Sequence, residues 1–158
     1  MDSELKLYTL MSGMLLKMIE DIPQEAMQEQ MGDGNPPSWI LGHLALANDF
    51  GVISLGGNAG LVGPWMQVFG PGSPPLGEHP SKRELVSMFS KSRKRLLSEV
   101  KSATEEQLQA ERNSPLLKAE LPNVQDMVAH LMTTHIALHI GQLSAWRRAK
   151  GMDSILQV

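Results

Sequence analysis

Apolar residues recur at helical spacing in four segments of this 158-residue chain, and no segment shows the apolar–polar alternation that is typical of a strand. Ser81, with Glu84 three residues later, is typical of a capping box at a helix start. The sequence therefore predicts an all-α chain, a single four-helix-bundle domain over 1–158 with helices of antiparallel type. The predicted helices are 3–22, Ser38 to about Leu55 with Ser38 as N-cap, Ser81 to at least Val100, and 122 to about 151.

Residues 56–80 interrupt this pattern, because they hold 7 of the 14 glycines and 5 of the 10 prolines. We predict no regular element here, only a long Gly/Pro-rich connection between the second and third helices. Such a connection in a compact domain is usually functional or disordered. Its apolar side chains, Trp65 among them, predict that it packs as a lid, and Trp65 is a candidate substrate contact.

The absence of cysteine excludes disulfides, thiolate metal sites and a cysteine nucleophile. The net charge of −3 argues against a nucleic-acid-binding protein, although residues 1–79 carry −7 and residues 80–158 carry +4. The basic residues of the second half lie within predicted helices, so a solvated helix face explains them. No signal peptide and no apolar run of about 18 residues is apparent, so we expect a cytoplasmic protein that does not enter a membrane.

Histidine is the residue type that points to chemistry here. His135 and His139 are four residues apart, so on a helix both side chains lie on one face and can reach one point. The pair alone fits either a metal site or two hydrogen-bonded core histidines. His43 lies on the inward face of the second helix, and three neutral imidazoles from two helices would suit zinc, nickel, iron or copper with one position left open.

The expected positions of His130, His79 and Gln142 differ from those of the three histidines above. His130 precedes His135 by five residues, about 140° around an α-helix, so it should face solvent or a neighbouring helix. His79 is expected to be an ordinary loop histidine, with a substrate contact as the alternative. Gln142, one turn after His139, could orient a ligand or sit at the helix rim. No carboxylate stands between His135 and His139 where a metalloprotease would place its general base.

Two motifs resemble the DinB/YfiT-like superfamily: SWILGHL at 38–44 and HIALHIGQL at 135–143. The WMQVFG segment at 65–70, before a serine-capped helix, is also similar to that family. The resemblance implies a four-helix bundle in which His43, His135 and His139 hold a divalent metal, often zinc or nickel, and frequently a homodimer. Ile140 departs from the family pattern, since many relatives have a basic residue there.

Three functions remain open at this point. The resemblance implies a thiol-dependent enzyme, because known relatives include transferases that use bacillithiol and isomerases that use mycothiol or glutathione. A metal-bound small thiol would then be the nucleophile that the chain itself lacks. Metal-assisted hydrolysis is the second reading, and a non-catalytic metal- or ligand-binding bundle is the third.

Overall fold

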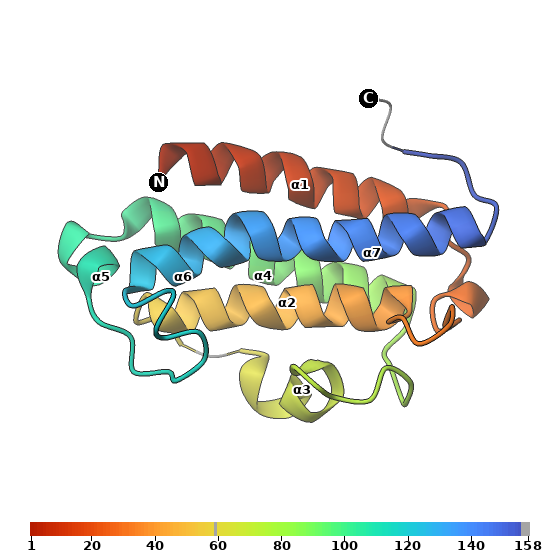
Figure 1. Ribbon diagram of the computed structural model, residues 1–158, viewed down its shortest axis with the longest axis horizontal. Coiled ribbons are helices and arrows are strands. Elements are labelled where there is room, and N and C mark those ends of the chain that lie inside the picture. Colours follow the sequence, from red (N-terminus) through yellow and green to blue (C-terminus); the bar gives the residue numbers. More distant parts are fainter. Residues whose placement is uncertain (59, 156–158) are drawn as a thin grey trace.

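A computed structural model describes residues 1–58 and 60–155, and the described part of the chain is helical without a named strand. Four long helical stretches form a bundle in which α2 lies between α4 and the last helix (Figure 1). The all-α prediction is thereby confirmed. The elements are α1 (Asp2–Glu20), η1 (Gln24–Ala26), α2 (Pro37–Ser54), α3 (Val62–Phe69), α4 (Lys82–Ser102), α5 (Glu105–Gln109), α6 (Val124–His130), the π-helical turn η2 (Leu131–His135) and α7 (Ile136–Ala149).

The helix α2 is the centre of the fold and is buried on nearly all sides, as its almost uniformly apolar sequence requires. It packs against α4 most extensively and also contacts α3, α6 and α7. Its start differs from the prediction. Pro36 is the N-cap and Pro37 opens the helix, because proline has the backbone angle of the first turn and needs no N–H there. The Ser38 hydroxyl instead pairs with His79 Nδ1 at 2.7 Å.

Neighbouring helices α2 and α4 run parallel, which corrects the expectation of antiparallel packing throughout. Their contacts advance together along the chain: Ser38, at the start of α2, pairs with His79 just before α4, and further along Asn48 pairs with Ser92 and Asp49 with Arg95. Figure 1 shows both helices running from right to left, opposite to α1 and α7. Parallel neighbours need a connection that returns along the bundle, about 27 Å for a helix of 18 residues. That requirement explains the long stretch between α2 and α4.

The prediction that this connection has no regular element is wrong for Val62–Phe69, which form α3. Pro64 is compatible with that helix because it lies in the first turn, where its missing N–H has no acceptor within the helix. Val62, Trp65 and Phe69 are spaced so that they share one face. The local proline and glycine content therefore concealed a short helix.

The predicted capping box at α4 is confirmed, since Ser81 and Glu84 each accept the other's backbone N–H. The last predicted helix is also present, but a π-helical turn at Leu131–His135 divides it into α6 and α7. Gly151 follows it with a left-handed φ of 70°, as expected just past a helix end. Within the described residues, no helix combines the length and the apolar character that a membrane span requires.

Candidate metal centre

The side chains of His43, His135 and His139 meet in the bundle interior, with one nitrogen of each within 4.8 Å of the others. His43 comes from α2, and the other two come from η2 and α7. His43 and His139 are 7% and 6% exposed, and His135 is partly buried. The structure therefore brings together the three residues that the sequence selected.

A backbone carbonyl fixes which nitrogen of His43 faces the cluster. Nδ1–H of His43 donates to the carbonyl of Phe69 at 2.7 Å, so Nε2 of the neutral ring carries the lone pair. Phe69 is the last residue of α3, where carbonyls have no partner within the helix. Gly42 makes this approach feasible, because a Cβ there would lie 2.6 Å from the Phe69 ring.

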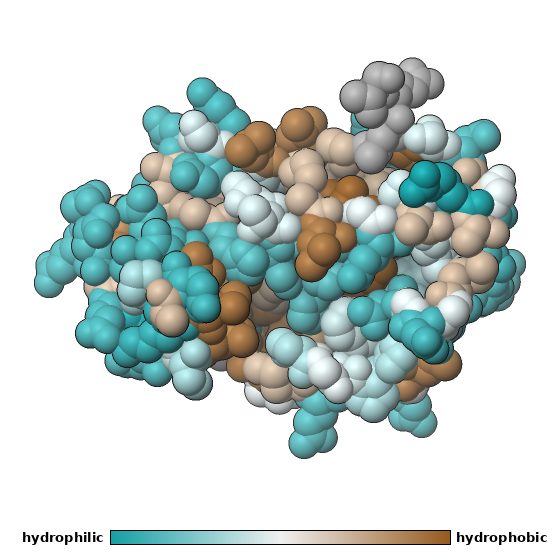
Figure 2. Space-filling model, viewed as in Figure 1, coloured by the Kyte–Doolittle hydropathy of each residue, from teal (hydrophilic) through white to brown (hydrophobic). Residues whose placement is uncertain are grey.

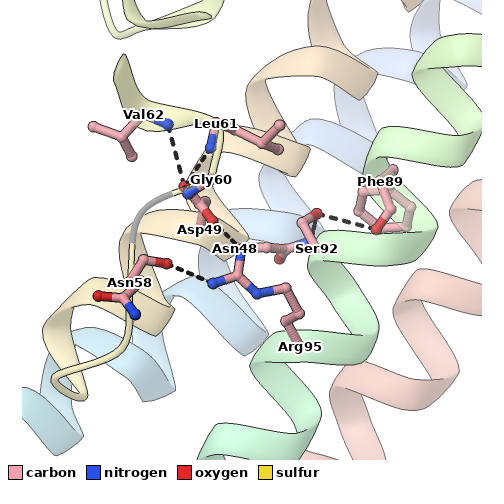
Figure 3. A network of polar contacts seen from close by, with 9 residues as sticks. All are labelled: Asn48, Asp49, Asn58, Gly60, Leu61, Val62, Phe89, Ser92 and Arg95. Carbon is pink, nitrogen blue, oxygen red and sulfur yellow. Dashed lines mark hydrogen bonds and ion pairs between the residues drawn. The ribbon is translucent and has the colours of Figure 1, made fainter. Parts of the chain in front are cut away.

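The helix α3 is held at its other end by Asp49, which lies six residues after His43 on α2. One carboxylate oxygen accepts the N–H groups of Gly60, Leu61 and Val62 at 2.7 to 3.1 Å, and the other pairs with Arg95 at 3.0 Å (Figure 3). A negative group at a helix start is favourable because the N-terminal N–H groups carry partial positive charge. Asp49 and His43 thus form hydrogen bonds to the two ends of the same short helix.

Two further side chains orient the cluster. Nδ1–H of His139 donates to Oε1 of Gln142 at 3.0 Å, which leaves Nε2 of His139 as the acceptor. Trp39 stacks on His43 with ring centroids 4.5 Å apart and planes 10° apart. Gln142 was selected from the sequence. Trp39 was missed, although its position four residues before His43 places both rings on one helix face.

A family model described as the DinB superfamily matches residues 7–143, which is most of the chain and includes all three histidines. The chain belongs to the DinB superfamily. A search of curated proteins finds no match. The helical bundle and the three-histidine cluster are what membership in this metal-binding superfamily leads one to expect.

The imidazole nitrogens of this DinB-superfamily cluster are better placed to coordinate a metal ion than to form hydrogen bonds with one another. Nε2 of His43 lies 3.2 Å from Nε2 of His135, and Nδ1 of His135 is buried without a hydrogen-bond partner. If His135 Nε2–H donates to His43, its Nδ1 lone pair stays unsatisfied; if the proton is on Nδ1, two lone pairs face each other. A cation between the two Nε2 atoms would accept both lone pairs, and the Nδ1–H of His135 would then be the one donor left over. Tetrahedral zinc ligands at about 2.05 Å stand about 3.3 Å apart, close to the separation of the His43 and His135 Nε2 atoms, while the three nitrogens together lie within 4.8 Å of one another.

Burial keeps these imidazoles neutral, as metal ligands must be. Desolvation, and then the nearby His139, His43 and His130, lowers the pKa of His135 to about 3. Desolvation, and then His43, lowers the pKa of His139 to about 4. Desolvation also lowers the pKa of His43, against the opposing effect of its bond to Phe69. All three therefore offer lone pairs at neutral pH.

His130 is predicted to face solvent or a neighbouring helix, but the structure places its ring beside that of His135. Its ring centroid lies 5.6 Å from that of His135, and its Nδ1 pairs with Thr134 Oγ1 at 2.7 Å. The cause is the π-helical turn at Leu131–His135, because an extra residue in the turn brings residues five apart onto one side. Helical periodicity assumes 3.6 residues per turn throughout and could not show this.

A cavity of about 530 Å³ opens beside the cluster in this DinB-superfamily fold. Its lining is apolar apart from a serine and three imidazoles, and it contains no carboxylate, lysine or arginine among the described residues. Trp65, selected from the sequence, is not among these residues and instead stacks on Phe69 at 5.7 Å. The lining is Trp39, His43, Leu46, Ala47, Phe50, Met66, Pro71, Ser114, Leu116, Leu117, Met127, His130, Leu131 and His135.

Proposed function

We propose that this protein is a divalent-metal-dependent enzyme that conjugates a low-molecular-weight thiol to an electrophile. The observation that carries this proposal is the contact between a three-histidine ligand set and a cavity that has no carboxylate in its described lining. Three protein ligands leave a coordination position open, as catalytic sites do. The superfamily's known thiol-dependent members support the choice of reaction class.

A divalent ion held by His43, His135 and His139, with zinc or nickel the first candidates, would lower the pKa of a coordinating thiol or water molecule. The chain's own groups have separate tasks. Phe69 and Gln142 hold the ligating rings in one tautomer, and the Trp39 ring covers one face of His43. The apolar lining excludes water from the reacting atoms, which strengthens every polar interaction inside.

The reaction needs little further acid–base chemistry from the protein. The thiol releases its proton to solvent, and its sulfur forms a bond to an electrophilic carbon. In a substitution the leaving group departs with the bonding electron pair; in an addition to an activated C=C the displaced electron pair moves to the neighbouring carbon, which takes up a proton. Hydrolysis stays the alternative, because the same ion would activate a bound water molecule, and His130, the single imidazole of the described lining outside the ligand set, could accept its proton. The known thiol-dependent members of the superfamily are the reason for preferring thiol conjugation.

Metal content and thiol dependence test this proposal together. Wild type, His139→Ala and His79→Ala should be stripped with a chelator, reloaded with zinc or nickel, and analysed for bound metal. We expect about one ion per chain in wild type and His79→Ala, and almost none in His139→Ala. The same three proteins should then be assayed with an activated aryl halide and glutathione, N-acetylcysteine or bacillithiol.

The outcome separates the three functional readings. Thiol-dependent conjugation by metal-loaded wild type and His79→Ala, but not by His139→Ala, is the expected result. Equal rates in wild type and His139→Ala would contradict the proposal. Metal-dependent cleavage of esters or amides without added thiol would favour the hydrolase, and a wild type that binds no metal would leave the non-catalytic bundle.

We propose in addition that two copies associate as a homodimer through α1 and α7. Leu7, Leu10 and Leu138 are 48%, 58% and 61% exposed on these neighbouring helices, and apolar side chains gather over α1 in Figure 2. Light scattering should give twice the 17.4 kDa chain mass. Leu138→Lys should halve that value, whereas a wild type that is already monomeric would contradict the proposal.

A further inference from the structure

The cavity beside the three histidines has apolar side chains at its mouth that the fold alone does not explain. Met66, Leu116 and Leu117 line the cavity but are 40%, 50% and 42% exposed. Figure 2 shows apolar surface around a hollow between the 110–121 segment and α3. Single exposed apolar residues are ordinary, but three from two segments around one cavity mark a binding surface.

Leu117 has an unfavourable backbone conformation in addition to its unfavourable solvent exposure. Its φ of 53° makes it the single non-glycine residue with a left-handed backbone in the described part of the chain. A leucine gains nothing from that conformation, which asparagine and glycine adopt more readily. Strained residues of this kind concentrate at functional sites and ligand clamps.

Arg112 holds Leu116 and Leu117 in place from beneath. Its side chain belongs to a residue only 3% exposed, and it donates to the carbonyls of Leu116 and Leu121 at 2.6 Å and of Leu117 at 3.4 Å. Burial lowers the pKa of this guanidinium, and no ion pair to a carboxylate is found for it among the described residues. The buried guanidinium of Arg112 thus donates its hydrogen bonds to backbone carbonyls of a single surface segment, residues 116–121.

We propose that Met66, Leu116 and Leu117 form a specificity wall for the apolar body of the electrophile, with Arg112 as its positioning residue. The substrate class that fits is an uncharged electrophile with an alkyl or aryl group, since the described lining of the cavity has no carboxylate to pair with a cation and no lysine or arginine to pair with an anion. The volume of about 530 Å³ is within the range of small-molecule sites. This inference rests on the proposed function for the reaction, but the ligand class can be tested by binding alone.

The first test uses the uncharged fluorophore N-phenyl-1-naphthylamine as a probe, without thiol. We expect saturable binding to metal-loaded wild type and about tenfold weaker binding to Leu117→Asn, as the loss of a buried leucine contact implies. Asparagine tolerates the left-handed backbone at position 117, so the segment should keep its conformation. Leu116→Asn is a second variant at the wall. Leu76→Asn is the matched control, because Leu76 is 48% exposed in another loop and does not line the cavity.

The second test uses a series of uncharged 2-enals of four to ten carbons with glutathione. The sulfur adds to the β-carbon, the C=C electrons move to the α-carbon, and that carbon takes up the proton that the thiol released, so the atoms balance. We expect kcat/KM to rise about three- to fourfold per methylene in wild type, through KM, until the cavity is filled. In Leu117→Asn the rise should be flatter, and Leu76→Asn should follow wild type.

The two tests separate failure of the inference from failure of the proposed function. Probe binding that depends on Leu117, with no turnover of any enal, supports the specificity wall and contradicts the thiol transferase. Turnover that is independent of chain length, or probe binding that is absent in wild type or unchanged in both wall variants, overturns the wall. Equal losses in Leu76→Asn and Leu117→Asn would overturn it too.

Discussion

Two groups of polar side chains lie on α2 within two turns of each other, and they differ in how completely they are satisfied. At Asn48 the amide oxygen accepts from Tyr8. The amide nitrogen donates to Ser92, whose hydroxyl donates to the Phe89 carbonyl (Figure 3). At His43 two imidazole nitrogens face each other, and Nδ1 of His135 has no partner. Buried polar groups in native proteins are nearly always paired, so an exception calls for an explanation. The satisfied group is structural, and the unsatisfied group is the candidate site.

The helix α3 joins the two groups physically. Asp49, next to Asn48, binds its first N–H groups, and its last carbonyl binds His43. The span of six residues on α2 is about 9 Å, and the eight residues of α3 are about 12 Å long, so one short helix can bridge the two positions. Loss of the Asp49 contacts should therefore reach the candidate metal site through α3, whereas loss of a hydrogen bond at Asn48 should not.

Asp49→Ala is expected to have the largest effect, about 3 kcal/mol of unfolding free energy. It leaves three N–H groups of the α3 start and the Arg95 guanidinium without their acceptor. Urea denaturation in chelator measures this. Asp49→Asn, which keeps one carbonyl acceptor, is the matched control and should lose less. A loss below about 1 kcal/mol for the alanine variant would show that α3 is not anchored here.

Gly42→Ala should weaken metal binding by about 10- to 100-fold, because the new Cβ would displace the Phe69 ring and with it the carbonyl that orients His43. A competition titration with a chromophoric zinc chelator measures the affinity. Gly141→Ala is the matched control, since a Cβ there meets nothing within 4 Å. It should keep the affinity and gain up to about 1 kcal/mol of stability. Equal metal affinities in both variants would show that the Phe69 carbonyl does not orient His43 for metal binding.

Acid should destabilise the metal-free protein between pH 6.5 and about 4. The pKa values of His135 and His139 are lowered to about 3 and about 4 in the fold, so unfolded histidines near 6.5 take up protons first as the pH falls. The two histidines therefore do not lower the free energy of unfolding above about pH 6.5, and each lowers it by about 1.4 kcal/mol per pH unit below that value. Urea titrations at pH 7, 6 and 5 measure the slope. His139→Leu should have a shallower slope than wild type, and an equal slope would contradict the assignment.

Tyr8→Phe should have the smallest effect, about 1 kcal/mol of unfolding free energy, because it leaves the buried Asn48 oxygen without its donor. Thermal or urea unfolding measures the loss, and elemental analysis should show unchanged metal content. A variant that loses metal as well would mean that the two polar groups on α2 are not separable in the way proposed.

Much of the fold followed from local pattern. The helices, the α4 capping box and the inward positions of His43, His135 and His139 depend on spacings of three and four residues that a helix converts directly into shared faces. Sequence periodicity did not predict the local structure where contacts between distant segments, or an irregular helical turn, determine it. Val62–Phe69 form a helix whose first N–H, with that of the N-cap Leu61, is accepted by Asp49 from another helix. His130 reached the site because of a π-helical turn, which leaves no mark in the periodicity.

The sequence by itself determined that the chain is helical, that His135 and His139 can share one point and that His43 faces inward, because side-chain direction on a helix is a local property. The tertiary structure alone decided that α2 and α4 run parallel, that the Phe69 carbonyl fixes the tautomer of His43, and that Arg112 holds Leu117 at a cavity mouth. The physical reason is that a backbone carbonyl has no residue type. Its partner is set by which segments come together in space, and that depends on the whole chain.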